Sequence, residues 1–103
     1  MTWGHKYRAV PTEADGIKFA SKAEARYYQF LKARQAAGEV VFFLRQVPWH
    51  LPGGVKYVCD FLVFEADGSC HVVDVKGMET PAFRAKRKQV EALYPVRIEV
   101  VNV

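Results

Sequence analysis

Two acidic residues interrupt apolar segments in the part of the chain between residues 57 and 77. Asp60 stands within the apolar segment 57–65, and Asp74 stands within the apolar segment 70–75. Both segments have the composition and length of buried strands. A carboxylate inside such a strand is costly unless it is paired or binds a metal ion. These two acids are therefore the first candidates for chemistry.

The turn between the two segments decides whether the acids meet. Residues 66–68 match a three-residue hairpin loop in which Gly68 takes a left-handed conformation. Counting back along both strands from this loop places Asp60 opposite Asp74. Opposite residues of an antiparallel pair share a face, with β-carbons about 4.5–5.5 Å apart. Lys76 then lies on that face as well, whereas a two-residue loop would turn Asp74 to the other face.

Two carboxylates at this separation repel each other, and the pKa of one of them rises unless a cation neutralises the pair. A hard divalent ion with oxygen ligands fits best, so we expect Mg²⁺, with Mn²⁺ as the alternative. Lys76 adds a second positive charge beside the ion. Such a site suits reactions in which negative charge develops on oxygen, as in the attack of water on a phosphodiester.

A third acid, Glu24, is predicted to reach the same region from a helix. Ser21 and Glu24 form a capping-box pattern at the start of a helix over residues 21–37, and Gly38 ends this helix. Glu24 also falls, at helical spacing, on the stripe that should face the sheet. Two interpretations stay open: Glu24 is only a helix cap, or it is a third metal ligand.

The remaining elements follow in a simple order. We predict a strand at 39–51, a turn at 52–54, the two strands described above, a helix from 80 to about 94 and a last strand at 97–103. The second helix is long enough for a crossover, so the last strand should run parallel to the third. The sequence therefore predicts an α/β (α+β) domain over residues 21–103, built as a helix, a three-stranded antiparallel meander, a helix and a final strand.

Residues 1–20 are predicted to form an N-terminal arm or a short hairpin. Asp15 and Gly16 are a turn dipeptide before the short apolar segment 17–19. Residues 6–8 are basic and aromatic, so an arm could contact the DNA backbone or a second subunit.

The composition indicates one folded domain and is compatible with a polyanionic partner, although many small basic proteins bind nothing acidic. The chain has 103 residues, half of them apolar, which is enough for a single hydrophobic core. Fifteen Lys and Arg against eleven Asp and Glu give a net charge of +4. Four basic residues are candidates for binding DNA phosphates, namely Lys22 on the first helix and Arg84, Arg87 and Lys88 on the second. Charged residues on a helix are otherwise typical of a solvated face.

Other features narrow the class of protein. No apolar run approaches the length of a membrane span and residues 1–6 do not form a signal peptide, so we expect a cytoplasmic protein without a membrane partner. Cys59 and Cys70 lack the spacing of a zinc site and are interpreted as small core residues. Gln46 could reach the site or a phosphate, and a solvated amide at a strand end is the favoured interpretation.

The combination of these elements and acids resembles the PD-(D/E)XK nuclease superfamily. Three motifs carry the resemblance: Ser-Lys-Ala-Glu-Ala at 21–25, Tyr-Val-Cys-Asp-Phe at 57–61 and Val-Val-Asp-Val-Lys-Gly at 72–77. They look like a small group of phage and prophage proteins within the superfamily. The arrangement is similar to that of the phage endonuclease I family of dimeric Holliday-junction resolvases. Cys59 stands where the name of the motif has proline.

The resemblance implies a role for each matching residue. Asp60 and Asp74 match the two acids of the motif, and Lys76 matches its lysine. Glu24 matches the helix-borne acid, and the backbone carbonyl of Val75 would also bind the metal. The implied protein is a Mg²⁺-dependent endodeoxyribonuclease with a restriction-endonuclease-like core that cuts branched DNA and leaves 5′-phosphate ends. A homodimer would fit symmetric cleavage, and a phage-encoded enzyme would act in the bacterial host cytoplasm.

Two other functions stay open at this point. A non-catalytic DNA-binding module could retain a nuclease fold, for instance in phage regulation or packaging. A metal-independent RNA endonuclease would need a histidine acid and a histidine base, and His5, His50 and His71 are too scattered in the sequence to support that chemistry.

Overall fold

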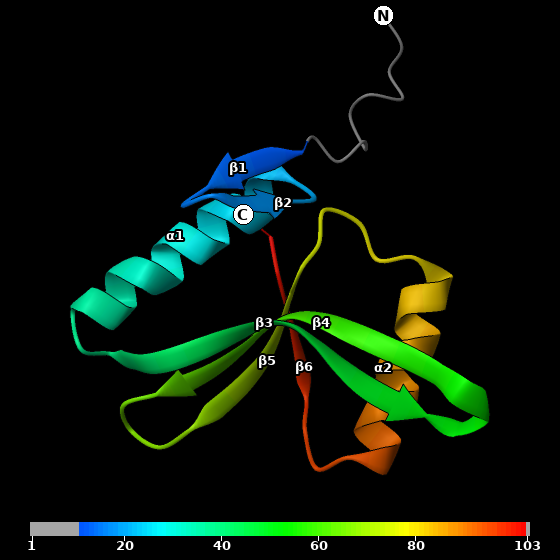
Figure 1. The fold of residues 1–103 in the computed structure, drawn as a ribbon. Helices are drawn as coiled ribbons and strands as arrows, with labels where there is room; N and C mark the ends of the chain where they lie inside the picture. The colour runs from blue at the N-terminus through cyan, green and yellow to red at the C-terminus, as the bar shows by residue number, and fades with distance from the viewer. Residues whose placement is uncertain (1–10, 103) are drawn as a thin grey trace, which may run out of the picture.

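The computed structural model describes residues 11–102, which form two helices, six strands and one short 3₁₀ helix (Figure 1). In chain order these are β1 (Thr12–Ala14), β2 (Ile17–Phe19), α1 (Lys22–Ala36), β3 (Val40–Leu51), η2 (Pro52–Gly54), β4 (Val55–Glu65), β5 (Cys70–Val75), α2 (Pro81–Leu93) and β6 (Ile98–Val101). The predicted α/β class and the predicted order of elements after residue 20 are confirmed. No helix within residues 11–102 is long and apolar enough to cross a membrane.

One four-stranded sheet forms the centre of the domain, with its strands in the order β3-β4-β5-β6. The first three strands are an antiparallel meander, and β6 pairs with β5 in parallel, as predicted. The helices pack on opposite faces of β5, because Val73 belongs to the cluster under α1 and its neighbour Val72 belongs to the cluster under α2. Figure 1 shows α1 and α2 on the two sides of the sheet.

Both helices begin at the capping residues that the sequence predicts. Ser21 Oγ accepts a hydrogen bond from the backbone N–H of Glu24 at 3.1 Å, and Thr80 Oγ1 accepts one from that of Phe83 at 3.1 Å. These bonds satisfy backbone donors that have no partner within the helix. α1 ends before Gly38, whose φ of 81° is the left-handed conformation of a helix-terminating glycine. The caps fix where each helix begins relative to the sheet.

The turn between β4 and β5 has the predicted geometry. The backbone N–H of Glu65 donates to the carbonyl of Ser69 at 2.9 Å, and Gly68 has a φ of 92°. The strand pairing then runs from Phe64 opposite Cys70 to Phe61 opposite Val73. The predicted register is therefore confirmed up to the pair that precedes the two acids.

The hairpin of β1 and β2 packs on α1. Ala14 and Phe19 are buried in the cluster under α1, and Tyr28 of α1 donates its hydroxyl proton to Asp15 Oδ2 at 2.9 Å. The predicted turn at Asp15 and Gly16 is present, because Ala14 pairs with Ile17. The basic start at residues 6–8 lies outside the described residues.

Side chains on one face of the β3–β4 hairpin contribute to both hydrophobic clusters. Phe61 and Val63 belong to the cluster under α1, whereas Tyr57 and Cys59 belong to the cluster under α2. Alternate residues of a strand normally share a face, so the ribbon must twist between Cys59 and Phe61. Gln46 of β3 lies opposite this point and has a φ of 54°, which is rare for a residue other than glycine.

Candidate active site

Hydrogen bonds link the strand segments of Asp60 and Asp74 at the point where β4 and β5 separate. The backbone N–H of Asp60 donates to Asp74 Oδ1 at 3.1 Å, and the backbone N–H of Val75 donates to Asp60 Oδ2 at 2.9 Å. These two bonds take the place of backbone pairing beyond the Phe61–Val73 pair. The carboxylates therefore lie between the two strands. The two acids are neighbours, as predicted, and each bonds to the backbone of the opposite strand.

Asp74 is the most deeply buried acid of the site. The residue is 1% exposed, and its Oδ2 atom is buried without a hydrogen-bond partner among residues 11–102. Burial raises the pKa of Asp74 to about 6, against the opposing effects of the Lys76 charge and the Asp60 N–H. A buried carboxylate oxygen without a partner is costly, and a bound cation would remove that cost.

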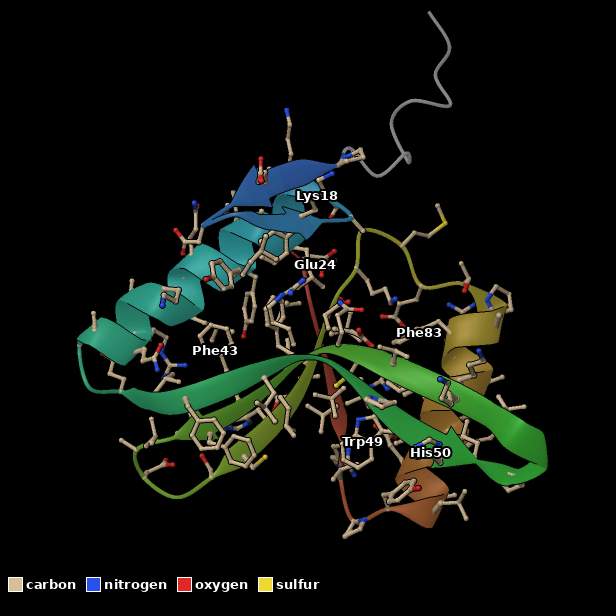
Figure 2. All side chains as sticks on the ribbon, in the orientation of Figure 1. Lys18, Glu24, Phe43, Trp49, His50 and Phe83 are labelled. Atoms are coloured by element: carbon tan, nitrogen blue, oxygen red, sulfur yellow. The ribbon has the colours of Figure 1, made fainter. Side chains whose placement is uncertain are left out.

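Glu24 reaches this region from the first turn of α1 (Figure 2). The residue is 6% exposed, and its Oε2 atom accepts a hydrogen bond from Gln46 Nε2 at 3.1 Å. Burial raises its pKa, and the charges of Asp60 and Asp74 raise it further. Ser21 caps the helix at the backbone N–H of Glu24, while the Glu24 carboxylate bonds to Gln46. This use of the carboxylate fits the interpretation of Glu24 as a metal ligand better than that of a helix cap alone.

Asp60 shares this electrostatic environment. Burial raises its pKa, whereas the Val75 N–H bond and the positive charge of Lys76 oppose the shift. The Gln46 side chain, which lies opposite Asp60, also lowers the pKa of Asp60 and favours its ionised form. Glu24, Asp60 and Asp74 are therefore three interacting carboxyls, and each has a raised pKa.

Lys76 stands at the end of β5, next to the acids. Its backbone N–H donates to the carbonyl of Val101 at 3.0 Å, and its Nζ lies 4.7 Å from the centre of the Phe83 ring in α2. Its charge favours the ionised forms of Glu24, Asp60 and Asp74. The structure therefore joins Asp60 and Asp74 by hydrogen bonds and places Glu24 and Lys76 within electrostatic reach of them.

A protein-family model matches nearly the whole chain, including the site described above. The model of a family described as a protein of unknown function (DUF1064) matches residues 4–101. The chain belongs to the DUF1064 family. Searches of curated proteins and of solved structures gave no match. The part matched to DUF1064 includes every candidate site residue, and the family description names no activity.

Gln46 is exposed, as a solvated amide would be, but it reaches the site instead of standing at a strand end. Gln46 lies within β3, opposite Asp60, and its amide bridges to Glu24 on α1. Its left-handed φ is a strained conformation of the type that collects at functional sites. Aligning the predicted strand at 39–51 in antiparallel register with the strand that contains Asp60 would have placed Gln46 opposite Asp60 from the sequence of this DUF1064 protein.

The donor set of this DUF1064 site fits a hard cation. Asp60, Asp74, Glu24 and the Val75 carbonyl offer only oxygen atoms, which suit Mg²⁺ or Mn²⁺. The unpartnered Oδ2 of Asp74 is a buried acceptor available to such an ion. Among residues 11–102, no three His, Cys, Asp or Glu side chains lie close enough together to form a ready metal cage. The match to a hard cation therefore depends on the oxygen donors and on the unpartnered Oδ2 atom of Asp74.

The basic residues predicted to bind DNA differ in their surroundings. Lys22, Arg84 and Lys88 are exposed, and Arg84 Nη1 donates to the Glu79 carbonyl at 2.9 Å. Arg87 is half-buried and contacts two acids, with Nη1 3.7 Å from one Glu79 oxygen and Nε 3.5 Å from Glu91 Oε2. Arg87 is therefore the least available of the four for a phosphate.

Two smaller expectations of the sequence have different outcomes. Cys59 is buried, as predicted, but Cys70 is exposed, so its interpretation as a core residue is wrong. His71 contacts Ser69 and Glu99 through its two ring nitrogens, and His50 is exposed at the far end of β3. Neither of these histidines is in the group of acids described above, and His5 lies outside the described residues.

Proposed function

We propose that this protein is a metal-dependent endodeoxyribonuclease with a restriction-endonuclease-like core. The observation that carries the proposal is the pair of hydrogen bonds that fixes Asp60 and Asp74 between the ends of β4 and β5. Glu24 and Lys76 complete a set of three acids and one cation. The same four residues match the motifs of the PD-(D/E)XK nucleases, which supports the same reaction class.

Each residue of the site would have a distinct role in phosphodiester hydrolysis. Asp60, Asp74, Glu24 and the Val75 carbonyl would hold Mg²⁺, or Mn²⁺, which polarises a phosphate oxygen and lowers the pKa of bound water. Lys76 would stabilise the negative charge that develops on the phosphate oxygens. Gln46 would orient the Glu24 carboxylate through the bond at 3.1 Å. Burial is the main cause of the raised pKa values of Glu24, Asp60 and Asp74, and a bound cation would offset the cost of ionising them there.

The proposed substrate is branched DNA, with the four-way junction as the first case to examine. A single small domain has little surface for reading a long base sequence, which favours recognition of DNA shape and backbone. A homodimer would place two sites on a symmetric junction. β3 is an edge strand with exposed Phe42 and Leu44, a surface that a second copy could cover. Sedimentation of the protein alone measures this association.

Cleavage of a labelled four-way junction and of a matched linear duplex tests the proposal. Each DNA is incubated with wild type, Asp74→Asn or the exposed-acid control Glu13→Gln, in Mg²⁺, Mn²⁺ or EDTA. We expect cutting by wild type and Glu13→Gln only, in either metal and not in EDTA. Cutting of the junction but not of the duplex would support the proposed substrate.

Two outcomes would contradict the proposal. Cleavage by Asp74→Asn at the wild-type rate would show that the Asp74 carboxylate is not needed for hydrolysis. Binding of both DNAs without cutting in any metal would favour a non-catalytic DNA-binding module on the same fold.

A further inference from the structure

Arg45 lies beside the acids but plays no part in the motifs considered so far. It pairs with Phe61 across the β3–β4 ribbon, and Phe61 directly follows Asp60 in the neighbouring strand. Its guanidinium carbon lies 4.4 Å from the centre of the Phe19 ring, which is 2% exposed. Its Nε atom is buried and has no hydrogen-bond partner among residues 11–102. A buried cationic donor without a partner requires a functional explanation.

Arg45 and Lys76 both compensate the negative charge of the acids. Burial raises the pKa values of Glu24 and Asp60, and the charges of Lys76 and Arg45 oppose the shift at both carboxyls. At Asp74 the opposing charge is that of Lys76. Arg45 thus acts on Glu24 and Asp60, and Lys76 acts on all three acids.

Each cation is held by an aromatic ring instead of an ion pair. The ion pairs among residues 11–102 involve Arg34, Arg87 and His71, and neither Arg45 nor Lys76 takes part in one. Stacking on a ring face orients a guanidinium while its N–H donors remain available at the edge of its plane. An acid partner would instead have occupied those donors.

We propose that Arg45 binds a DNA phosphate next to the scissile bond, and that Phe19 holds the guanidinium in position for this contact. The planar fork of N–H donors matches two oxygens of one phosphate. The inference rests on the proposed function, because it assigns a substrate contact at the same site. It also gives the β1–β2 hairpin a role, since that hairpin supplies the ring.

A purely structural role for Arg45 is the competing explanation. In that case the guanidinium would only offset the negative charge of Glu24 and Asp60 and pack on Phe19. Loss of Arg45 would then lower stability, or slow the cleavage of every DNA by the same factor. A phosphate contact instead predicts that the loss depends on the charge of one particular phosphate.

The test uses the DNA that the wild type cuts, with a single uncharged methylphosphonate placed in turn at each phosphate flanking the cleavage position. Single-turnover rates are measured for wild type, Arg45→Gln, Arg45→Lys and Phe19→Leu, with exposed Lys18→Gln in the same hairpin as control (Figure 2). We expect Arg45→Gln to slow cleavage about 10- to 100-fold, the scale of lost charge-assisted hydrogen bonds. Arg45→Lys and Phe19→Leu should lose less, and Lys18→Gln nothing.

One methylphosphonate position should slow wild type by a similar factor and leave the rate of Arg45→Gln unchanged. Equal slowing of both proteins at every position, or wild-type rates in Arg45→Gln, would overturn the inference while the proposed function stands. If Arg45→Gln does not fold, by circular dichroism, Arg45→Lys and Phe19→Leu decide by the same comparison of positions. A wild type that cuts no DNA in any metal would overturn the proposed function and this inference with it.

Discussion

Asp74 is a nearly inaccessible carboxyl, and one of its oxygens has no hydrogen-bond partner within residues 11–102. Its pKa is about 6 in the folded chain, against an ordinary value of 3.8, because burial disfavours the charged form. Between these two values the folded state binds more protons than the unfolded state. The contribution of Asp74 to the free energy of unfolding therefore falls as the pH rises through this window, and it stays low above it.

Asp74→Asn is expected to stabilise the metal-free protein at neutral pH. The amide keeps an oxygen that can accept the Asp60 N–H and removes the buried charge. Relative to wild type, its free energy of unfolding in EDTA should increase by roughly 2–3 kcal/mol between pH 4 and pH 7, the equivalent of the pKa shift of Asp74. Urea unfolding at several pH values measures the difference. A difference that does not change with pH would contradict the charged, buried state of Asp74.

At the scale of single elements, the twist of β3 depends on the backbone of one residue. Gln46 has a φ of 54° inside a twelve-residue strand. A left-handed conformation costs about 1–2 kcal/mol for a residue with a β-carbon and almost nothing for glycine. The amide of Gln46 compensates for part of this cost by its bond to Glu24.

Two substitutions at this position separate the backbone from the side chain. Gln46→Ala and Gln46→Gly both remove the bond to Glu24, but only glycine adopts the left-handed conformation without strain. We expect Gln46→Gly to be more stable than Gln46→Ala by about 1 kcal/mol, the reverse of the usual order in a strand. Urea unfolding of both variants is the measurement. An alanine variant of equal or greater stability would show that the strand straightens when the amide is lost.

The elements themselves could be predicted because their signals are local. Thr80 and Pro81 mark the start of α2, and Gly68 sets the hairpin loop from which the register of β4 and β5 follows. That register was sufficient to bring Asp60 and Asp74 together. The exchange of backbone bonds between them could not be predicted, since it depends on the separation of two strands.

Two residues depend on distant contacts: Arg45, which sequence reasoning missed, and Gln46, for which reach to the site was the less favoured interpretation. Gln46 reaches Glu24 only because a left-handed residue twists β3 inside a strand-forming sequence. Arg45 owes its position to the ring of Phe19, which arrives from a separate hairpin. Neither contact has a signature in the composition or periodicity of its own segment.

At the scale of the whole molecule, the net charge of +4 coexists with an acidic site. For the proposed function, attraction to DNA would therefore come from basic residues outside the acidic site. Arg84 and Lys88 are exposed on α2, whereas Arg87 contacts Glu79 and Glu91. Phosphate contacts add affinity that weakens as salt increases.

Charge removal on α2 is expected to weaken DNA binding in a graded way. Arg84→Gln and Lys88→Gln should each reduce the slope of the logarithm of affinity against the logarithm of salt concentration by about 1. Arg87→Gln should change it less, and Lys32→Gln, an exposed lysine near the end of α1, serves as the matched control. Fluorescence anisotropy in the Asp74→Asn background, without cutting, is the measurement. An equal effect of Lys32→Gln would point to a nonspecific surface charge.

The twisted β3–β4 ribbon has a consequence for how the chain unfolds. One side of the ribbon supplies the cluster under α1 in one half and the cluster under α2 in the other. Separating either helix from the sheet exposes part of the same pair of strands, so the two clusters should open together as one cooperative unit. Backbone amides of β4 on the two sides of Asp60 should then show equal protection against hydrogen exchange. Markedly different protection would divide this small domain into two independently opening halves, joined at the candidate active site.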